Sequence, residues 1–169
     1  MAVHDAPLGG VFEDFVLGEV SRHPLGPTIR GAANTWFTRV TMNTHPMHLD
    51  GRYAAKSEFG RILVNSTLTV AIVSGQSVID TSQLAFANLG WDEIRLSNPV
   101  FVGDTLYAES EVLELRESSS RENGGIVTIR TRGLNQDGHE VVRYRRTFMV
   151  YKRGSEGATS PFPQPKTPW

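Results

Sequence analysis

The sequence contains no cysteine among its 169 residues. This absence excludes a disulfide framework, a thiol nucleophile and a thiolate metal site, and it is compatible with a reducing compartment. The fold must therefore rest on a hydrophobic core. A length of 169 residues fits one domain, and 39% hydrophobic residues with 21% charged residues is an ordinary globular balance.

Net charge and long apolar runs are also lacking. The formal net charge is −1, so no overall field favours nucleic acid or acidic lipid. No lysine or arginine precedes Arg22, which argues against a secretory signal, and the apolar stretch at residues 62–73 is too short and polar to cross a bilayer. We therefore expect a cytoplasmic protein that binds neither nucleic acid nor membrane.

The composition divides the chain into three parts. We expect a loose arm at residues 1–10, a domain at residues 11–153 and a tail at residues 154–169, which holds four of the nine prolines. Phe162 and Trp169 in the tail could dock on the body or on a neighbouring subunit. An irregular tail is the simpler interpretation.

The first half of the domain has helical patterns. A short helix is expected over residues 52–57 and a longer one over residues 66–79, capped by Asn65 or Ser66. Apolar residues recur every three or four positions along the longer helix. The predicted stripe consists of Leu68, Ala71, Ile72, Gly75, Val78 and Ile79. Its width and the lack of charge predict a helix that is buried on most sides.

From Leu84 onward the apolar period shortens to two, which is typical of strands. Strands are expected over residues 15–22, 91–96, 104–115, 125–134 and 140–152, with a hairpin turn at residues 135–139. One buried helix beside long antiparallel strands predicts an α+β fold in which a sheet wraps around a central helix.

Candidate catalytic side chains are concentrated in residues 41–50, where Asn43, His45, His48 and Asp50 surround a proline. Histidine titrates near neutral pH and is suited to proton transfer. Alternatively, Asn43 and Asp50 cap the adjacent helices and the histidines lie on the surface. No metal is expected, because the proline separates the two histidines and no further ligand is clustered beside Asp50.

These residues and several later segments resemble the MaoC-like family of (R)-specific enoyl-CoA hydratases. The similar segments are residues 43–48, 53–54, 59–60, 62–66 and 98–106, and the resemblance covers about residues 12–151. It implies a hotdog fold, hydration or dehydration of an acyl-CoA thioester, no metal or redox cofactor, and a homodimer that shares the acyl tunnel. The variants at residues 42–50 and 64–66 are similar to the mesaconyl-CoA hydratase (β-methylmalyl-CoA dehydratase) branch, which acts on short, branched dicarboxylic thioesters.

The resemblance assigns His48 to the family's catalytic histidine, but other positions differ. Asn43 stands in place of the catalytic aspartate and His45 in place of an asparagine, while Asn65 and Ser66 replace a His-Gly pair. We expect His48 to act as acid and base, alone or assisted by His45, and Asn43 to position the water. The Ser66 amide is the expected oxyanion donor. His45 and Asn65 are expected to contact the substrate, although Asn65 and Ser66 could be plain helix caps.

The last predicted hairpin is rich in arginine. Arg143 and Arg145 alternate and share a face, on which they could bind the phosphates of coenzyme A, whereas Arg146 points to the other face. A solvated face that protects a sheet edge is the alternative. A carboxylated substrate would need a further cation. The candidates are Arg30, Arg39 and Arg61.

Two rival functions remain open. A hotdog thioesterase usually places a carboxylate on or beside the central helix, and residues 65–79 contain none. A non-catalytic acyl-CoA-binding subunit is favoured by the loss of the aspartate at Asn43. A serine nucleophile at Ser66 is disfavoured, because the sequence has no Gly-x-Ser-x-Gly elbow.

Overall fold

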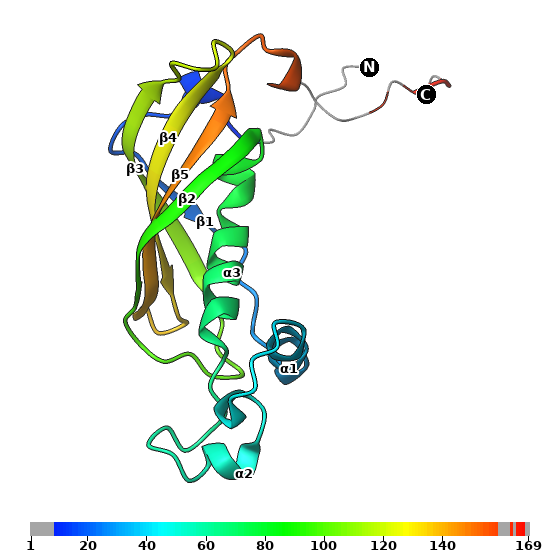
Figure 1. The fold of residues 1–169 in the computed structure, drawn as a ribbon, viewed down its shortest axis with the longest axis vertical. Helices are drawn as coiled ribbons and strands as arrows, with labels where there is room; N and C mark the ends of the chain where they lie inside the picture. The colour runs from blue at the N-terminus through cyan, green and yellow to red at the C-terminus, as the bar shows by residue number, and fades with distance from the viewer. Residues whose placement is uncertain (1–8, 159–162, 164, 168–169) are drawn as a thin grey trace.

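A computed structural model describes residues 9–158, 163 and 165–167 of the chain. The structure is built on one antiparallel sheet with one long helix that lies against it (Figure 1). Phe162 and Trp169 of the tail, and residues 1–8 of the predicted arm, lie outside the described residues. No helix in the described ranges is long and apolar enough to cross a membrane.

The sheet has five strands in the order β1-β3-β4-β5-β2, and all its pairings are antiparallel. The strands are β1 (Val20–His23), β2 (Ala85–Leu96), β3 (Tyr107–Glu117), β4 (Gly124–Leu134) and β5 (Glu140–Tyr151). The α+β class is confirmed and each of the five predicted strands has a counterpart, although β1 begins at Val20 rather than at residue 15, and β2 begins well before residue 91. Register shifts interrupt its pairing with β5, so its first residues show no regular alternation for a sequence pattern to detect.

The helices precede β2. They are α1 (Gly31–Val40), α2 (Gly51–Ala54) and α3 (Ser66–Gln76), with the short helical segments η1 (Phe12–Asp14), η2 (Pro46–His48) and η3 (Val78–Ser82). A further short segment, η4 (Glu156–Ala158), follows β5. The longer predicted helix corresponds to α3, which is followed after Ser77 by the π-helical segment η3. In Figure 1, α1 and α2 gather at the end of the molecule where α3 begins.

The stripe predicted for α3 was correct only in part, since Leu68 is buried and Ile72 packs against the larger core cluster. The buried face of α3 carries Leu68, Thr69 and Val73, whereas Ala71 and Gly75 are exposed. Because a polar residue occupies part of the buried face, a search for apolar residues selects a neighbouring stripe. The expectation that the helix is buried on most sides was also wrong, because Ser66, Thr67, Ala71 and Gly75 are exposed along it.

A glycine lets α3 lie close to the middle of the sheet. A Cβ added to Gly133 of β4 would lie 2.5 Å from Cγ2 of Val73, a distance that real Cβ atoms do not adopt. Val73 belongs to the larger core cluster, together with Leu68, Leu106 and Val142. The close contact at Gly133 therefore fixes the position of α3 on β4, and with it the position of the helix start.

Candidate functional site

The loop that carries the candidate catalytic residues begins at the end of α1. The Asn43 N–H donates to the Thr38 carbonyl and the Met42 N–H to the Arg39 carbonyl, each at 3.0 Å. These two bonds form a Schellman motif, in which the residue after the C-cap adopts a left-handed conformation. Met42 fills this position with a φ of 55°, where glycine is usual. The motif fixes the direction in which the loop leaves the helix.

Asn43 and His45 stabilise the turn itself. Asn43 Oδ1 accepts a hydrogen bond of 3.0 Å from the His45 N–H, and His45 Nδ1 accepts one of 3.1 Å from the Met47 N–H. Asp50 caps α2 by accepting two backbone hydrogen bonds, as the capping interpretation predicted. The roles of Asn43 in holding water and of His45 in substrate contact stay predictions.

The imidazole of His48 is held by a neighbouring backbone segment. Its Nδ1 lies 3.1 Å from the carbonyl oxygen of Leu63. A carbonyl only accepts, so Nδ1 carries the proton in this bond and Nε2 of the neutral ring has a free lone pair. Within the described ranges no group hydrogen-bonds to Nε2. The half-buried His48 is thus a base whose tautomer is fixed by its surroundings.

His48 and Ser66 line the same cavity, which has a volume of about 250 Å³. The other walls come from Phe59, residues 63–64, Thr69, residues 96–100 and Val141. This volume is sufficient for a short acyl group but not for a complete coenzyme A thioester. No aspartate or glutamate is among the described residues that line it. The cavity thus offers an imidazole, a helix start and apolar walls, without a carboxylate.

Ser66 is the first residue of α3, and its backbone N–H has no acceptor among the described residues. The N–H groups of a first helical turn carry the positive end of the helix dipole and favour negative charge. The preceding Asn65 is the helix cap, because its Oδ1 accepts from the N–H and the hydroxyl of Thr67 at 3.1 and 2.7 Å. Asn65 is buried and does not line the cavity, so its predicted contact with substrate has no support here.

Asn34 of α1 is the residue of this site that sequence reasoning missed. Its Nδ2 donates to the carbonyl oxygens of His48 at 3.1 Å and Leu63 at 3.2 Å, and its Oδ1 accepts from the Asn65 N–H at 2.9 Å. The sequence held one weak signal. Asn34 and Thr38 lie four residues apart and so share one face of α1, and that polar face is buried.

Arg143 and Arg145 do not lie beside His48. They share a face of β5, as predicted, and pair with Glu140 at 3.8 Å and Glu93 at 3.5 Å. The same hollow holds ion pairs between β4 and β3, which join Arg130 to Glu111 and Arg132 to Glu109. Arg130, Arg132 and Arg145 therefore belong to a cross-strand ladder of ion pairs, whereas Arg143 pairs within β5 with Glu140, three residues earlier. The role of Arg143 and Arg145 in binding phosphate stays a prediction.

In this ladder, Glu109 has a pKa that differs from its ordinary value. A hydrogen bond from Arg132 lowers the pKa of Glu109 below its ordinary value, against a smaller opposing effect of burial, and Arg22 adds to the lowering. The carboxylate therefore stays charged in mildly acidic solution, and its ion pairs persist there.

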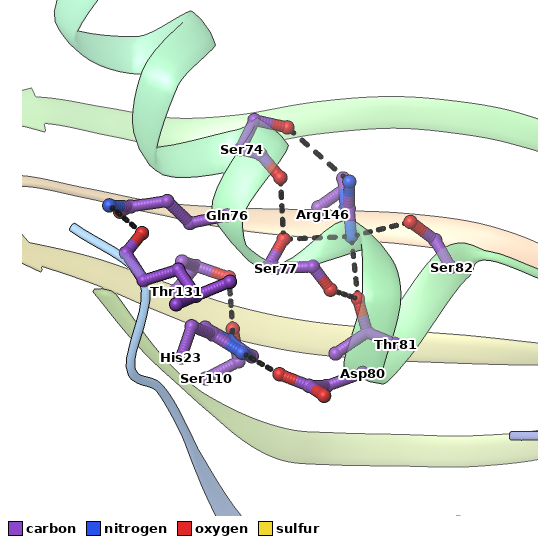
Figure 2. Close-up of polar contacts among 11 residues, drawn as sticks. His23, Ser74, Gln76, Ser77, Asp80, Thr81, Ser82, Ser110, Thr131 and Arg146 are labelled. Carbon is purple, nitrogen blue, oxygen red and sulfur yellow. Dashed lines mark hydrogen bonds and ion pairs between the residues drawn. The ribbon is translucent and has the colours of Figure 1, made fainter. Parts of the chain in front are cut away.

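Arg146 points to the opposite face, as predicted, and is buried beneath the end of α3 (Figure 2). Its guanidinium donates to the hydroxyls of Ser77, Thr81 and Ser82 at 3.0 to 3.2 Å, and more weakly to Ser74. Within the described ranges no carboxylate pairs with it, and burial lowers the pKa of Arg146. The cation is compensated by hydroxyls and by the carbonyl end of the helix.

Figure 2 also shows a second polar group, in which His23 lies between Asp80 and Ser110. The distances are 2.7 Å from Nδ1 to the Asp80 carboxylate and 2.9 Å from Nε2 to the Ser110 hydroxyl, which also contacts Thr131. These are the residue types and distances of a nucleophilic triad. However, His23 and Ser110 are only 2% and 3% exposed, so a substrate carbonyl has no access to the hydroxyl. We interpret this group as a structural link between β1, β3 and η3.

The three candidate cations for a substrate carboxylate have different positions. Arg30 and Arg39 lie exposed at the two ends of α1. The guanidinium of Arg61 stacks 3.7 Å from the centroid of the Phe101 ring, whose centroid lies 6.4 Å from that of Phe59 in the cavity wall. No acid among the described residues pairs with Arg61. It is thus an unpaired cation next to the cavity of His48.

No group of three or more His, Asp or Glu side chains in the described ranges is close enough to hold a metal ion.

The family model of mesaconyl-CoA hydratases matches residues 3–160. Mesaconyl-CoA hydratase of Cereibacter sphaeroides is 38% identical over 160 residues, which are 95% of this chain and 46% of that protein. The chain thus spans about half the length of the curated relatives that it matches. A MaoC-domain dehydratase of Chloroflexus aurantiacus superposes with a TM-score of 0.84 and 30% identity, over 99% of this chain and 46% of its own. A Mycobacterium tuberculosis protein with a double hotdog fold superposes with a TM-score of 0.78 and 25% identity, over 93% of this chain and 46% of its own. The predicted hotdog fold is confirmed.

Proposed function

The chain belongs to the mesaconyl-CoA hydratase family, and from this premise we propose that it adds water to a short enoyl-CoA thioester, or removes it from the 3-hydroxyacyl-CoA. The observation that carries this proposal is the shared cavity of His48 and Ser66. It combines a base of fixed tautomer with an unpaired backbone N–H at a helix start. Hydration of an enoyl thioester needs both of these groups.

His48 performs the proton transfers in this proposal. In hydration, Nε2 takes a proton from water while the water oxygen bonds to the β-carbon. The imidazolium then gives a proton to the α-carbon, so the ring returns to its neutral state. The bond from Nδ1 to Leu63 keeps Nε2 directed to the reacting atoms throughout. Dehydration follows the same steps in reverse.

The Ser66 amide stabilises the negative charge that develops on the thioester oxygen. Its N–H has no other acceptor in the described structure, so it donates without first breaking a protein hydrogen bond. Asn43 does not line the cavity of His48 and its Oδ1 already accepts from the His45 N–H, so it would hold the attacking water through its Nδ2 donor. An amide takes no proton at neutral pH. No metal or redox cofactor enters these steps.

We propose Arg61 as the side chain that selects a carboxylated, dicarboxylic acyl group. A guanidinium that already stacks on Phe101 and has no acidic partner loses little rotamer freedom when it binds a carboxylate. Arg30 and Arg39 lie on the exposed ends of α1 and lack such support. Of the three candidates, only Arg61 contacts an aromatic ring that adjoins the cavity wall.

The unpaired edge of the sheet favours a second copy of the chain as the partner. The edge strand β2 is long and leaves one side unpaired in the strand order. Its exposed apolar side chains are Leu89, Trp91, Ile94 and Leu96. Relatives about twice as long hold a further half within one chain, and a homodimer would supply the equivalent half here. A cytoplasmic location stays a prediction.

The test is hydration of a panel of enoyl-CoA thioesters, including crotonyl-CoA and mesaconyl-CoA, by the wild type and His48→Ala. Mass spectrometry separates a gain of water from the release of free coenzyme A. Water gain that disappears in His48→Ala supports the proposal, and a preference for mesaconyl-CoA that disappears in Arg61→Met supports the carboxylate site.

Two outcomes would contradict the proposal. Free coenzyme A as the product would make the chain a thioesterase, a function that a cavity wall without a carboxylate does not favour. Tight binding without turnover would make it a non-catalytic acyl-CoA-binding subunit and would direct attention to the lost aspartate at Asn43.

A further inference from the structure

The side chain of Asn34 connects α1 to the two segments that bring His48 and Ser66 to the cavity. It is 1% exposed, and its three hydrogen bonds reach the His48 carbonyl in the loop and, in the short stretch that leads into α3, the Leu63 carbonyl and the Asn65 N–H. Two carbonyls face Nδ2 and one N–H faces Oδ1, so the orientation of the amide is unambiguous. No other side-chain amide in the described ranges bonds to both of these two segments.

We propose that Asn34 is a positioning residue that sets both the place and the basicity of His48. The proposal rests on the proposed hydratase function. Asn34 acts on position because it holds the backbone of His48 and the start of α3 at fixed distances from one point on α1. The imidazole and the Ser66 amide therefore keep their spacing across the cavity. A small displacement of such groups can reduce a rate greatly.

Asn34 acts on basicity through the carbonyl oxygen of Leu63. This oxygen accepts from His48 Nδ1 at 3.1 Å and from Asn34 Nδ2 at 3.2 Å. The bond to His48 becomes stronger when the ring is protonated, because a charged donor binds the carbonyl more tightly. The Asn34 donor competes for the same oxygen, and it therefore limits how much stronger the bond to His48 becomes. Removal of the Asn34 donor should therefore make His48 easier to protonate.

An asparagine meets these requirements where its nearest analogues fail. Aspartate keeps an acceptor for the Asn65 N–H but would direct a negative charge at two carbonyl oxygens. Serine is too short to reach all three groups. Both substitutions remove the donor to Leu63, and aspartate also adds a charge that favours the protonated ring.

Thr38 provides a matched control on the same helix. It lies one turn after Asn34, is fully buried, and touches Asn65 through a long 3.4 Å bond, without contact to His48 or Leu63. Thr38→Val removes a buried polar group of similar size from the same face. A loss that arises only from weaker packing of α1 should appear equally in Thr38→Val and in Asn34→Asp.

The experiment compares wild type, Asn34→Asp and Thr38→Val in crotonyl-CoA hydration, and follows the ring nitrogens of His48 by NMR as a function of pH. His48→Gln identifies the His48 signals. For Asn34→Asp we expect kcat to fall at least about tenfold with a smaller change in KM. We also expect the acid limb of the kcat/KM profile and the His48 NMR titration to move upward by roughly half a pH unit or more. Thr38→Val should leave both curves where they are.

Asn34→Ser replaces Asn34→Asp if the latter does not fold, and the expected direction is the same. An Asn34 variant whose His48 titration coincides with that of wild type would overturn the inference. The inference would also be overturned if the Asn34 and Thr38 variants lost kcat equally and the acid limb of the kcat/KM profile did not move. The NMR readout does not depend on turnover, so a wild type that hydrates no thioester would refute the proposed function and still leave the Asn34 inference tested.

Discussion

The Nδ1 atom of His48 and the carbonyl oxygen of Leu63 lie 3.1 Å apart, and this bond determines which ring nitrogen is free to react. His45 has a different partner, because its Nδ1 accepts from the backbone N–H of Met47. In the neutral ring the proton of His45 is therefore on Nε2. Two histidines in one loop thus have opposite tautomers.

This difference predicts unequal effects of the two histidines on catalysis. His48→Ala should lower kcat by roughly 10²–10⁴ because it removes the proton carrier. His45→Ala should act mainly on KM and leave most of kcat. Steady-state kinetics with crotonyl-CoA measure both values, and thermal unfolding checks that both variants are folded. Equal losses of kcat would show that His45 shares the proton transfers.

The left-handed backbone at Met42 predicts a stabilising substitution. Met42→Gly should raise the free energy of unfolding by about 0.5–1 kcal/mol, because glycine adopts this conformation without a steric cost. Thr41→Gly is the control, since Thr41 has a φ of −85° and should lose about 1 kcal/mol. Urea unfolding measures both. A loss at Met42 would mean that its side chain stabilises the loop more than the backbone strains it.

Arg146 is buried without an acidic partner in the described structure, so we predict that its packing contributes more to the free energy of unfolding than its charge does. Arg146→Ala should cost about 2–4 kcal/mol through the cavity that it leaves under α3. Arg146→Met, which fills most of the same volume, should cost about 1.5 kcal/mol or less. Unfolding in urea distinguishes the two variants. Similar costs would instead assign the stability to the hydrogen bonds with Ser77, Thr81 and Ser82.

The lowered pKa of Glu109 predicts a loss of stability in acid. A carboxyl whose pKa is lower in the folded state stabilises the protein above its unfolded value of about 4.5, and this contribution disappears as the pH falls through the folded value. Glu109→Gln should therefore be less stable than wild type at pH 7, and the difference should shrink below pH 4. Urea unfolding at several pH values tests this. Glu58→Gln, at an exposed position without an ion pair in the described structure, should show no such trend.

The unpaired edge of β2 predicts a dimer. Light scattering should give twice the chain mass of 18.7 kDa for wild type, and a double substitution Leu89→Lys with Ile94→Lys should shift the mass to that of one chain. Leu17→Lys is the control. Leu17 is exposed and precedes β1, the strand at the edge opposite β2, so this variant should remain a dimer. A single-chain mass for wild type would contradict the proposed partner.

Local sequence patterns determined most of the secondary structure elements of this protein. Period-two alternation predicted the strands, and the stretch after Asn65 predicted α3, because these signals depend only on residues close in the chain. The motif order from residue 43 to residue 106 indicated the family and led to His48 and Ser66. The alternation of Arg143, Arg145 and Arg146 gave their faces correctly, since a strand always turns successive side chains to opposite sides.

Only the tertiary structure decided what these residues touch. No pattern showed that Thr69 belongs to the buried face of α3, or that Asn34 connects α1 to His48 and Asn65, because these contacts join residues distant in sequence. Likewise, Arg145 could not be recognised from sequence as a member of the ion-pair ladder, since its partner Glu93 lies on the neighbouring strand β2. The sequence determined which groups are present, whereas the register of the sheet and the packing of α3 decided which of them share the cavity.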